Sequence, residues 1–220
     1  MGLTLVIGNK NYSSWSLRPW LVLKQAGVPF EEIFVPLYEP GSKEKILQYS
    51  PSGKVPLLIH GKVKVWESLA IAEYLAELFP KAKLWPADIA DRAWARAISQ
   101  EMHAGFTALR THMPMNVRSS YPGHGRHPEV DKDIARVSAI WRECRERFKN
   151  RGEFLFGHFT IADAMYAPVV FRFKTYGVPL SGLEKDYFET MLNLPAMKEW
   201  AQVGLKETQR IAQSEIYANK

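Results

Sequence analysis

The sequence predicts a small α/β domain over residues 1–80, a linker at 81–87 and an all-helical domain over 88–220. Three observations support this division. Apolar runs of strand length alternate with helix-like stretches through the first eighty residues. From about Asp88 onward no convincing strand pattern appears. The linker contains Trp85-Pro86, and 220 residues are enough for two small domains.

The first domain is predicted to have the element order β-α-β-α-β-β-α, which is that of a thioredoxin-like fold. Gly27 ends the first helix, because glycine readily adopts the conformation found just after a helix. His60-Gly61-Lys62 forms a hairpin-like turn between the last two strands. The strands are predicted at Leu3–Ile7, Glu32–Val35, Leu57–Ile59 and Val63–Trp66, and the helices at Trp15–Ala26, Ser42–Tyr49 and Ser68–Leu78.

The second domain is predicted to contain long helices at Asp88–Arg110 and Asp131–Lys149, with prolines including Pro128 breaking the chain between them. A further helix begins at Thr160, where Thr160 and Asp163 are spaced as in a capping box with Asp in place of Glu. Such a box stabilises a helix start by about 1 kcal/mol. These two residues are therefore interpreted as structural rather than catalytic.

The composition is that of a globular protein, with 46% hydrophobic and 24% charged residues. No apolar stretch reaches the length of a transmembrane helix, and the N-terminus lacks the basic region and cleavage site of a signal peptide. A single cysteine, Cys144, excludes an internal disulfide and suits a reducing compartment. We expect a cytoplasmic protein that does not bind membranes.

The net charge of +6 and the sequence pI of about 9.3 raise the question of nucleic-acid binding. The basic residues between Arg136 and Arg151 are interrupted by Glu143 and Glu146, as on a solvated helix face. No zinc-finger, basic-zipper or RNA-recognition pattern is present. The six histidines show no metal-ligand spacing. The sequence therefore predicts neither a nucleic-acid partner nor a metal.

The most informative segment is Ser52–Ile59, an apolar run that opens with Pro56. Proline donates no ladder hydrogen bond, so this position predicts a tight X-Pro bend before a short strand, with both the cis and the trans form of the bond left open. The bend would leave the backbone of Val55 free to pair with an extended peptide. Glu67-Ser68 then opens a helix, whose N–H groups and dipole favour a carboxylate. Together these features predict a cradle for a small anionic peptide.

The pattern Ser-x-Gly-Lys-Val-Pro-x-Leu, followed by Glu-Ser-x-Ala-Ile-x-Glu-Tyr-Leu, resembles the glutathione S-transferase family, nearest to its bacterial serine-type, zeta- and beta-like members. The resemblance implies a homodimeric transferase that uses glutathione as a substrate and adds its thiolate to a small electrophile. It also implies that Lys54 and Val55 contact the glutathione backbone. Glu67 would face the α-amino group, and Ser68 the γ-glutamyl carboxylate.

Ser13 and Ser14 are the catalytic candidates, because they lie between the first strand and the first helix. A free thiol with a pKa near 8.5 is only a few per cent ionised at neutral pH. Lowering that pKa by about two units requires roughly 2.7 kcal/mol, which a charge-assisted hydrogen bond and a helix terminus can supply. The alternative is that one serine only caps the helix.

Three side chains with a hydroxyl group are alternative candidates for the hydrogen bond to the thiolate. Aligning the helix that begins near Trp15 with zeta- and beta-type members places Ser13 where those groups carry cysteine, and Asn11 at the zeta-type catalytic serine. A short loop insertion would favour Ser14 instead. Tyr12 is the third candidate, because other classes of the family use tyrosine.

The acceptor-site candidates are Tyr12, Phe106, Arg110 and Arg172; Arg118 also suits an acidic acceptor. The triplet beginning at Arg172 resembles one in maleylacetoacetate isomerase-like members, about one helical turn out of register. Two alternatives follow. One is glutathione-dependent cis–trans isomerisation of an unsaturated dicarboxylate. The other is a non-catalytic binding or scaffold protein.

Overall fold

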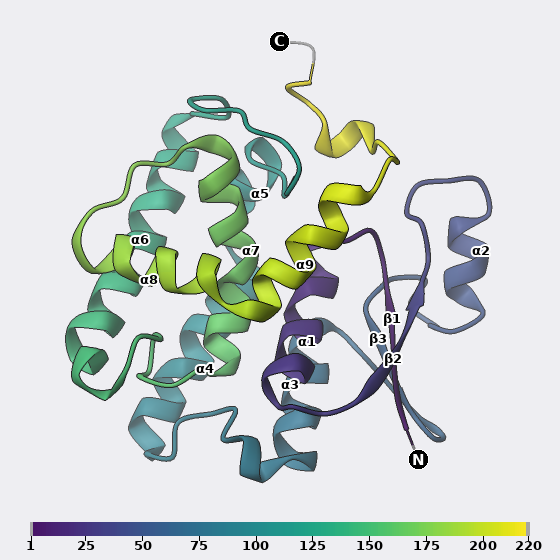
Figure 1. Ribbon diagram of the computed structural model, residues 1–220, viewed down its shortest axis with the longest axis horizontal. Coiled ribbons are helices and arrows are strands. Elements are labelled where there is room, and N and C mark those ends of the chain that lie inside the picture. The colour runs from purple at the N-terminus through teal and green to yellow at the C-terminus, as the bar shows by residue number, and fades with distance from the viewer. Residues whose placement is uncertain (1, 219–220) are drawn as a thin grey trace.

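The computed structural model describes residues 2–218, which form a small mixed sheet with helices on both faces, followed by a larger group of helices (Figure 1). The strand order in the sheet is β2-β1-β3-β4. β1 pairs with β2 in parallel, whereas β1–β3 and β3–β4 are antiparallel. The strands span Leu3–Ile7 (β1), Phe30–Phe34 (β2), Leu57–His60 (β3) and Val63–Trp66 (β4).

Helices cover both faces of this sheet, since successive side chains of a strand point to opposite faces. Leu5 and Ile7 of β1 join the main core, which α1 (Ser14–Gln25) and α3 (Ser68–Leu78) share. Val6 faces the other way and packs with Ile46 of α2 (Ser42–Leu47) in a small second core. In Figure 1, α2 lies on the opposite side of the sheet from α1 and α3.

The helical part is organised around α7, of whose residues all but Lys174 are buried. α7 packs against both α1 and α4, so it joins the helical part to the sheet part. The remaining elements are η1 (Pro80–Ala82), α4 (Ile89–Ala104), α5 (Thr107–His112), α6 (Pro128–Phe148), η2 (Lys149–Arg151), α7 (Ile161–Tyr176), α8 (Gly182–Asn193), α9 (Pro195–Lys206) and η3 (Ala212–Ser214). The predicted fold class is confirmed.

The predicted helix Asp88–Arg110 is wrong in one respect, because the structure has two helices there. α4 ends at Ala104, Gly105 is extended, and Phe106 adopts a left-handed conformation with φ +60° before α5 begins. Glycine is a weak helix former, and the N–H of Leu109 in the new helix donates to Asp133 at 2.9 Å. A local pattern of apolar residues could not reveal that distant acceptor.

Several other boundaries also differ from the prediction. α6 begins at Pro128 rather than Asp131, with His127 as its cap. Pro128 was predicted to break the chain, but proline is well suited to the first turn of a helix, where its missing N–H needs no partner. β2 covers Phe30–Phe34 instead of Glu32–Val35, and α1 begins at Ser14 instead of Trp15.

The start of α7 is a buried capping box. The N–H and the hydroxyl of Thr160 donate to one oxygen of the Asp163 carboxylate at 2.7 and 3.0 Å. Leu155 donates its N–H to the other oxygen at 3.0 Å. Burial raises the pKa of Asp163 to about 6, against these hydrogen bonds, which favour the ionised form.

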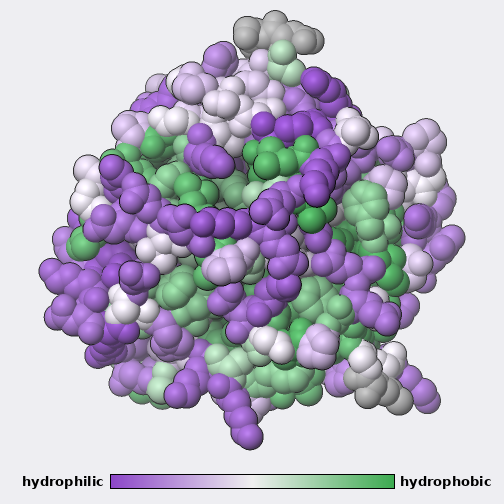
Figure 2. All heavy atoms as spheres, in the orientation of Figure 1, coloured by the Kyte–Doolittle hydropathy of each residue, from purple (hydrophilic) through white to green (hydrophobic). Residues whose placement is uncertain are grey.

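The visible surface in Figure 2 is mostly polar, with smaller apolar patches between the charged side chains. None of the helices among residues 2–218 is both long and apolar enough to span a bilayer. Cys144 is fully buried in α6, and this burial raises the pKa of its thiol. A buried neutral thiol is a packing group rather than a nucleophile.

Candidate functional site

Two adjoining pockets lie where the sheet part meets the helical part, and they share Trp15, Lys54 and Val55. We call them the Glu67 pocket, of about 380 Å³, and the Ser13 pocket, of about 540 Å³. The Glu67 pocket is also lined by Ser52, Pro56, Trp66, Glu67, His103 and Ala104. The Ser13 pocket is also lined by Tyr12, Ser13, Ser14, Leu37, Tyr38, Glu39, Ser42, Lys43, Ile46, Gly53, Ile211 and Ser214.

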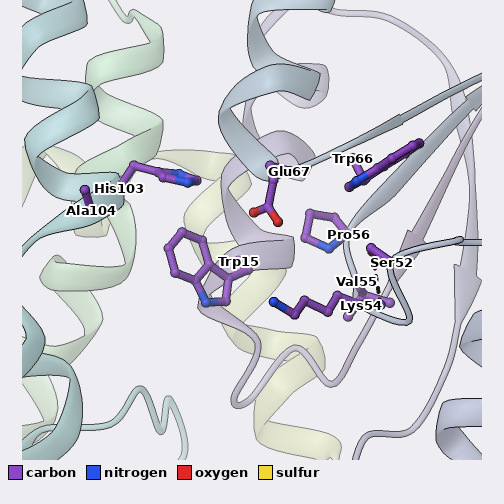
Figure 3. Close-up of a pocket in the computed structure, with 9 residues that line it drawn as sticks. All are labelled: Trp15, Ser52, Lys54, Val55, Pro56, Trp66, Glu67, His103 and Ala104. Atoms are coloured by element: carbon purple, nitrogen blue, oxygen red, sulfur yellow. Dashed lines mark hydrogen bonds between the residues drawn. The ribbon is translucent and has the colours of Figure 1, made fainter.

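Opposite charges face the Glu67 pocket. Figure 3 shows the Glu67 carboxylate pointing from the start of α3 toward the space beside Trp15 and Pro56. The Lys54 side chain extends toward the same space from the other wall. Both side chains are exposed and neither makes an ion pair within the part of the chain that the structure describes. The pocket therefore suits a ligand that carries both an ammonium and a carboxylate.

The backbone around this pocket is unusual at two residues. Glu67 has a φ of +39°, in a region that non-glycine residues rarely adopt and that costs about 1–3 kcal/mol. The Val55–Pro56 peptide bond is cis, and β3 begins only at Leu57, so Val55 lies outside the strand ladder. Backbone strain like that at Glu67 concentrates at functional sites, which supports a binding role for this residue.

Ser68 lies beside Glu67 as the first residue of α3, but it is fully buried and does not line either pocket. Its hydroxyl oxygen has no hydrogen-bond partner among the described residues. An unpartnered buried hydroxyl next to a pocket requires an explanation. A carboxylate at the start of α3 would supply the missing partner.

The two serines at the start of α1 differ in their hydrogen bonds. Ser13 is the N-cap: its hydroxyl contacts the hydroxyl of Ser16 at 2.8 Å and accepts the N–H of Ser16 at 3.4 Å. Ser16 in turn accepts the N–H of Gly8 at 3.1 Å. Ser14 is half-buried, and its hydroxyl has no side-chain partner in residues 2–218. Both serines line the Ser13 pocket.

Tyr12 lines the same pocket, but its hydroxyl is already occupied. It donates to the carboxylate of Glu215 and receives a hydrogen bond from Arg118 at 2.8 Å. Burial and the neighbouring Glu215 raise the pKa of this phenol. A phenol that is already committed to a carboxylate is poorly placed to donate to a thiolate, so Tyr12 contributes its ring to the pocket wall. Asn11, the zeta-type position, is also committed: its side-chain amide bonds Asn116 and Arg118.

The segment after α9 closes the outer side of the Ser13 pocket, where it contributes Ile211 and Ser214. Glu207 anchors its beginning by accepting the N–H groups of Lys10 and Asn11 at 2.6 and 3.0 Å. Further along, Glu215 accepts hydrogen bonds from Arg118, Tyr12 and Tyr121. We call residues 207–217 the tail. Sequence reasoning missed it, since the side-chain bonds of Glu207 and Glu215 that hold it in place are made to residues distant in the chain.

Phe106, Arg110 and Arg172, predicted for the acceptor site, lie elsewhere. They do not line either pocket. Phe106 is buried between α4 and α5, and Arg172 is 4% exposed on α7. Arg110 stacks on Trp15, with its guanidinium carbon 4.9 Å from the ring centre. These side chains pack between the helices and therefore do not line the cleft.

Trp15 and His103 were missed as site residues. Trp15 is the only aromatic residue common to both pockets, and its ring meets the His103 ring edge-on at 5.2 Å. Burial and the nearby Arg18 lower the pKa of His103, which favours its neutral form. The position of Trp15 in the first turn of α1, directly after Ser13 and Ser14, was a sequence signal that it lines the site. In the sequence, His103 falls within a mostly apolar series with Met102, Phe106, Leu109 and Met113, whose spacing is typical of core packing.

The family models decide the affiliation. The glutathione S-transferase N-terminal domain matches residues 12–78, and the corresponding C-terminal domain matches residues 92–202. The chain belongs to the glutathione S-transferase family. In this transferase the Glu67 pocket takes residues from both matched regions, with Glu67 in the first and His103 in the second, whereas the Ser13 pocket combines the first region with Ile211 and Ser214 beyond the second.

Individual relatives agree with this result. The transferase is 28% identical to a probable maleylacetoacetate isomerase from Caenorhabditis elegans over 83% of this chain and 85% of that protein. It is also 28% identical to a maleylacetoacetate isomerase from Rattus norvegicus, with 76% of each chain covered. A Burkholderia glutathione transferase homologue with bound glutathione shares the fold at TM-score 0.70 and 24% identity, covering 93% of this chain and 98% of that one.

Proposed function

We propose that this transferase binds glutathione across both pockets and adds its thiolate to a small electrophile. The observation that supports this most strongly is the continuity of the cleft: Lys54 and Val55 belong to both pockets, with Glu67 at one end and Ser13 at the other. Glutathione is an extended tripeptide with an ammonium at one end and a thiol at its centre. Its α-ammonium pairs with Glu67, and its thiol lies at the start of α1.

In this proposal, Ser13 is the thiolate partner. Hydroxyl hydrogens can rotate, so the Ser13–Ser16 contact can reverse its direction when the thiolate arrives. Ser16 then donates to Ser13, and Ser13 donates to sulfur, while the N–H of Gly8 remains bound to Ser16. Each bond in such a chain strengthens the next. The N-terminus of α1, which begins at Ser14, adds the positive end of the helix dipole next to the thiolate.

The electrophile is held in the Ser13 pocket. Leu37, Ile46 and Ile211 give this pocket apolar walls from three separate segments, which suits a small apolar acceptor. The sulfur forms a C–S bond with the electrophilic carbon, and the leaving group departs with its bonding electron pair. With an unsaturated acceptor there is no leaving group, and the resulting carbanion takes a proton from solvent. The protein contributes orientation and electrostatic stabilisation.

The test is the pKa of the bound glutathione thiol, followed through the ultraviolet absorbance of the thiolate in wild type, Ser13→Ala and Ser14→Ala. We expect Ser13→Ala to raise that pKa by about 1–2 units, because a charge-assisted hydrogen bond is worth about 1.5–3 kcal/mol. Ser14→Ala should change it much less. An unchanged thiol pKa in both variants would leave a glutathione-binding protein without the proposed catalysis.

A second candidate function is favoured by the relatives described as maleylacetoacetate isomerases. Here the thiolate adds to a cis double bond, the resulting single bond rotates, and elimination of the thiolate returns glutathione unchanged. Conversion of a cis-dicarboxylate acceptor without net consumption of glutathione would select this function. Formation of a stable thioether would select conjugation.

We also propose a cytoplasmic homodimer, with residues 1–80 as the glutathione-binding domain, 81–87 as the linker and 88–220 as the helical domain. The lone buried thiol of Cys144 is compatible with a reducing compartment. Apolar side chains exposed on the sheet part, Val63, Trp66 and Leu78, supply candidate contacts for a second copy. Sedimentation of the wild type against a Trp66→Glu, Leu78→Glu variant tests the dimer: the variant should sediment as a monomer.

A further inference from the structure

Three arginine side chains from different helices lie wholly or partly inside the fold: Arg18 on α1, Arg110 on α5 and Arg172 on α7. Arg110 and Arg172 both act electrostatically on Arg18, and Arg110 also acts on Arg172. Arg18 and Arg172 are 1% and 4% exposed, and Arg110 is half-buried. A guanidinium stays protonated in proteins, so this arginine cluster places three like charges inside the fold.

Main-chain carbonyls bind one side of each guanidinium. They satisfy part of its donor capacity but bring no full negative charge. Arg18 Nε donates to the carbonyl of Met165 at 3.1 Å, Arg172 Nε to that of Met113 at 2.9 Å, and Arg110 Nη2 to those of Met102 and His103 at the end of α4.

A counter-charge is missing from the arginine cluster. Within residues 2–218 none of the three arginines makes an ion pair with Asp or Glu. Asp133 acts on Arg110 from further away, but its carboxylate already accepts the N–H of Leu109. Burial and the neighbouring Arg110 lower the pKa of Arg172 to about 10. An uncompensated buried charge strongly destabilises a fold.

Unpartnered donors are the second observation that indicates a missing counter-charge at the arginine cluster. Nη1 of Arg18, Nη1 of Arg172 and Nε of Arg110 are each buried without a hydrogen-bond partner. Buried N–H groups of native proteins almost always have a partner, including bound ions. Positive charge combined with free N–H donors is the chemistry that binds a small anion.

We propose that the arginine cluster is an anion site that holds one compact anion of halide or carboxylate chemistry. It is separate from the proposed glutathione site, because none of the three arginines lines either pocket. It is also close to that site: the Trp15 ring centre lies 4.2 Å from the guanidinium carbon of Arg18 and 4.9 Å from that of Arg110. The anion therefore lies behind the wall that Trp15 forms for the cleft.

Bromide is the probe for a direct test, because its anomalous scattering locates it in crystals of the wild-type protein. We expect a bromide peak within hydrogen-bonding distance of the Arg18 and Arg172 guanidiniums. Crystals soaked in acetate at the same concentration distinguish the two sources, since planar density there identifies a carboxylate. If neither probe binds at the arginine cluster, the proposal is wrong.

Thermal unfolding gives a test in solution. Sodium bromide is titrated into wild type, Arg172→Met and the control Arg136→Met, whose exposed arginine pairs with Glu101. Saturating bromide should raise the Tm of wild type and control by about 5 °C more than that of Arg172→Met. Without bromide, loss of one repelling charge should cost Arg172→Met little stability. Equal bromide responses in all three proteins would overturn the proposal. If Arg172→Met does not fold, the bromide and acetate diffraction experiment decides the question.

Discussion

The two pockets of the cleft are built in different ways. The Glu67 pocket takes most of its lining from one short stretch, residues 52–67, and carries opposite charges. The Ser13 pocket draws on four stretches that are far apart in the chain, including the tail, and has more apolar walls. The charged end of the proposed glutathione ligand is therefore bound by a local, charged motif. The proposed acceptor is bound between segments that are separate in the chain.

The largest effect is expected for Asp163→Asn, which should affect neither pocket selectively. The asparagine amide would face the N–H and hydroxyl of Thr160, which now donate to the carboxylate. We expect a loss of about 2–4 kcal/mol in the free energy of unfolding, measured by urea denaturation. The glutathione Kd of the folded fraction should be unchanged. A change in that Kd, without a loss of stability, would contradict the structural role given to Asp163.

Asp163 also predicts a pH dependence. Its pKa of about 6 in the folded protein lies above the ordinary value of 3.8, so the folded state binds the proton more tightly. The stability that this group contributes is therefore fully present below about pH 4 and is lost as the pH rises through 6. The destabilisation by Asp163→Asn should grow by about 2 kcal/mol between pH 6 and pH 4. A difference that does not vary over this range would show that burial does not raise this pKa.

Glu67→Gln should act on the Glu67 pocket alone. It removes the charge that pairs with the glutathione ammonium, and we expect glutathione to bind about 10- to 100-fold more weakly by calorimetry. The KM for the acceptor should stay the same. Glu44→Gln is the matched control, because it removes the same charge from the exposed surface of α2. Equal effects of the two variants would mean that Glu67 acts only through net charge.

Glu215→Gln should act on the Ser13 pocket alone. It weakens the ion pair with Arg118, at 2.9 Å, and the bonds from Tyr12 and Tyr121 that hold the tail. We expect the acceptor KM to rise about 3- to 10-fold, because the tail wall loosens. Glutathione affinity should not change. Glu189→Gln, at an exposed pair with Lys185, is the control. A glutathione affinity that falls while the acceptor KM rises would remove the distinction between the pockets.

Ser16→Ala should give the smallest effect, at the point where the two pockets meet. It interrupts the chain from Gly8 to Ser13 but leaves the Ser13 hydroxyl in place. We expect the thiol pKa of bound glutathione to rise by about half a pH unit, equivalent to about 0.7 kcal/mol. A rise as large as that of Ser13→Ala would instead make Ser16 the main support of the thiolate.

The contrast between the pockets also explains what the sequence could predict. Val55 and Glu67 were predicted from Pro56 and from the helix start after Trp66, which are local signals within sixteen residues, and Lys54 was predicted from the resemblance of the same segment to the family. Ile211 and His103 reach the cleft only through the packing of α4 and the tail, which no short pattern encodes. Arg110 was assigned to the acceptor site from residue type, and Arg172 from residue type and the resemblance of its triplet; helix packing placed both side chains away from the pockets instead.

A crystal structure of the protein with glutathione tests the central claim most directly. The account predicts the ammonium at the Glu67 carboxylate, the cysteinyl backbone beside Val55, and the sulfur within hydrogen-bonding distance of the Ser13 hydroxyl. A tripeptide bound in the opposite direction, or with its sulfur away from the start of α1, would contradict it.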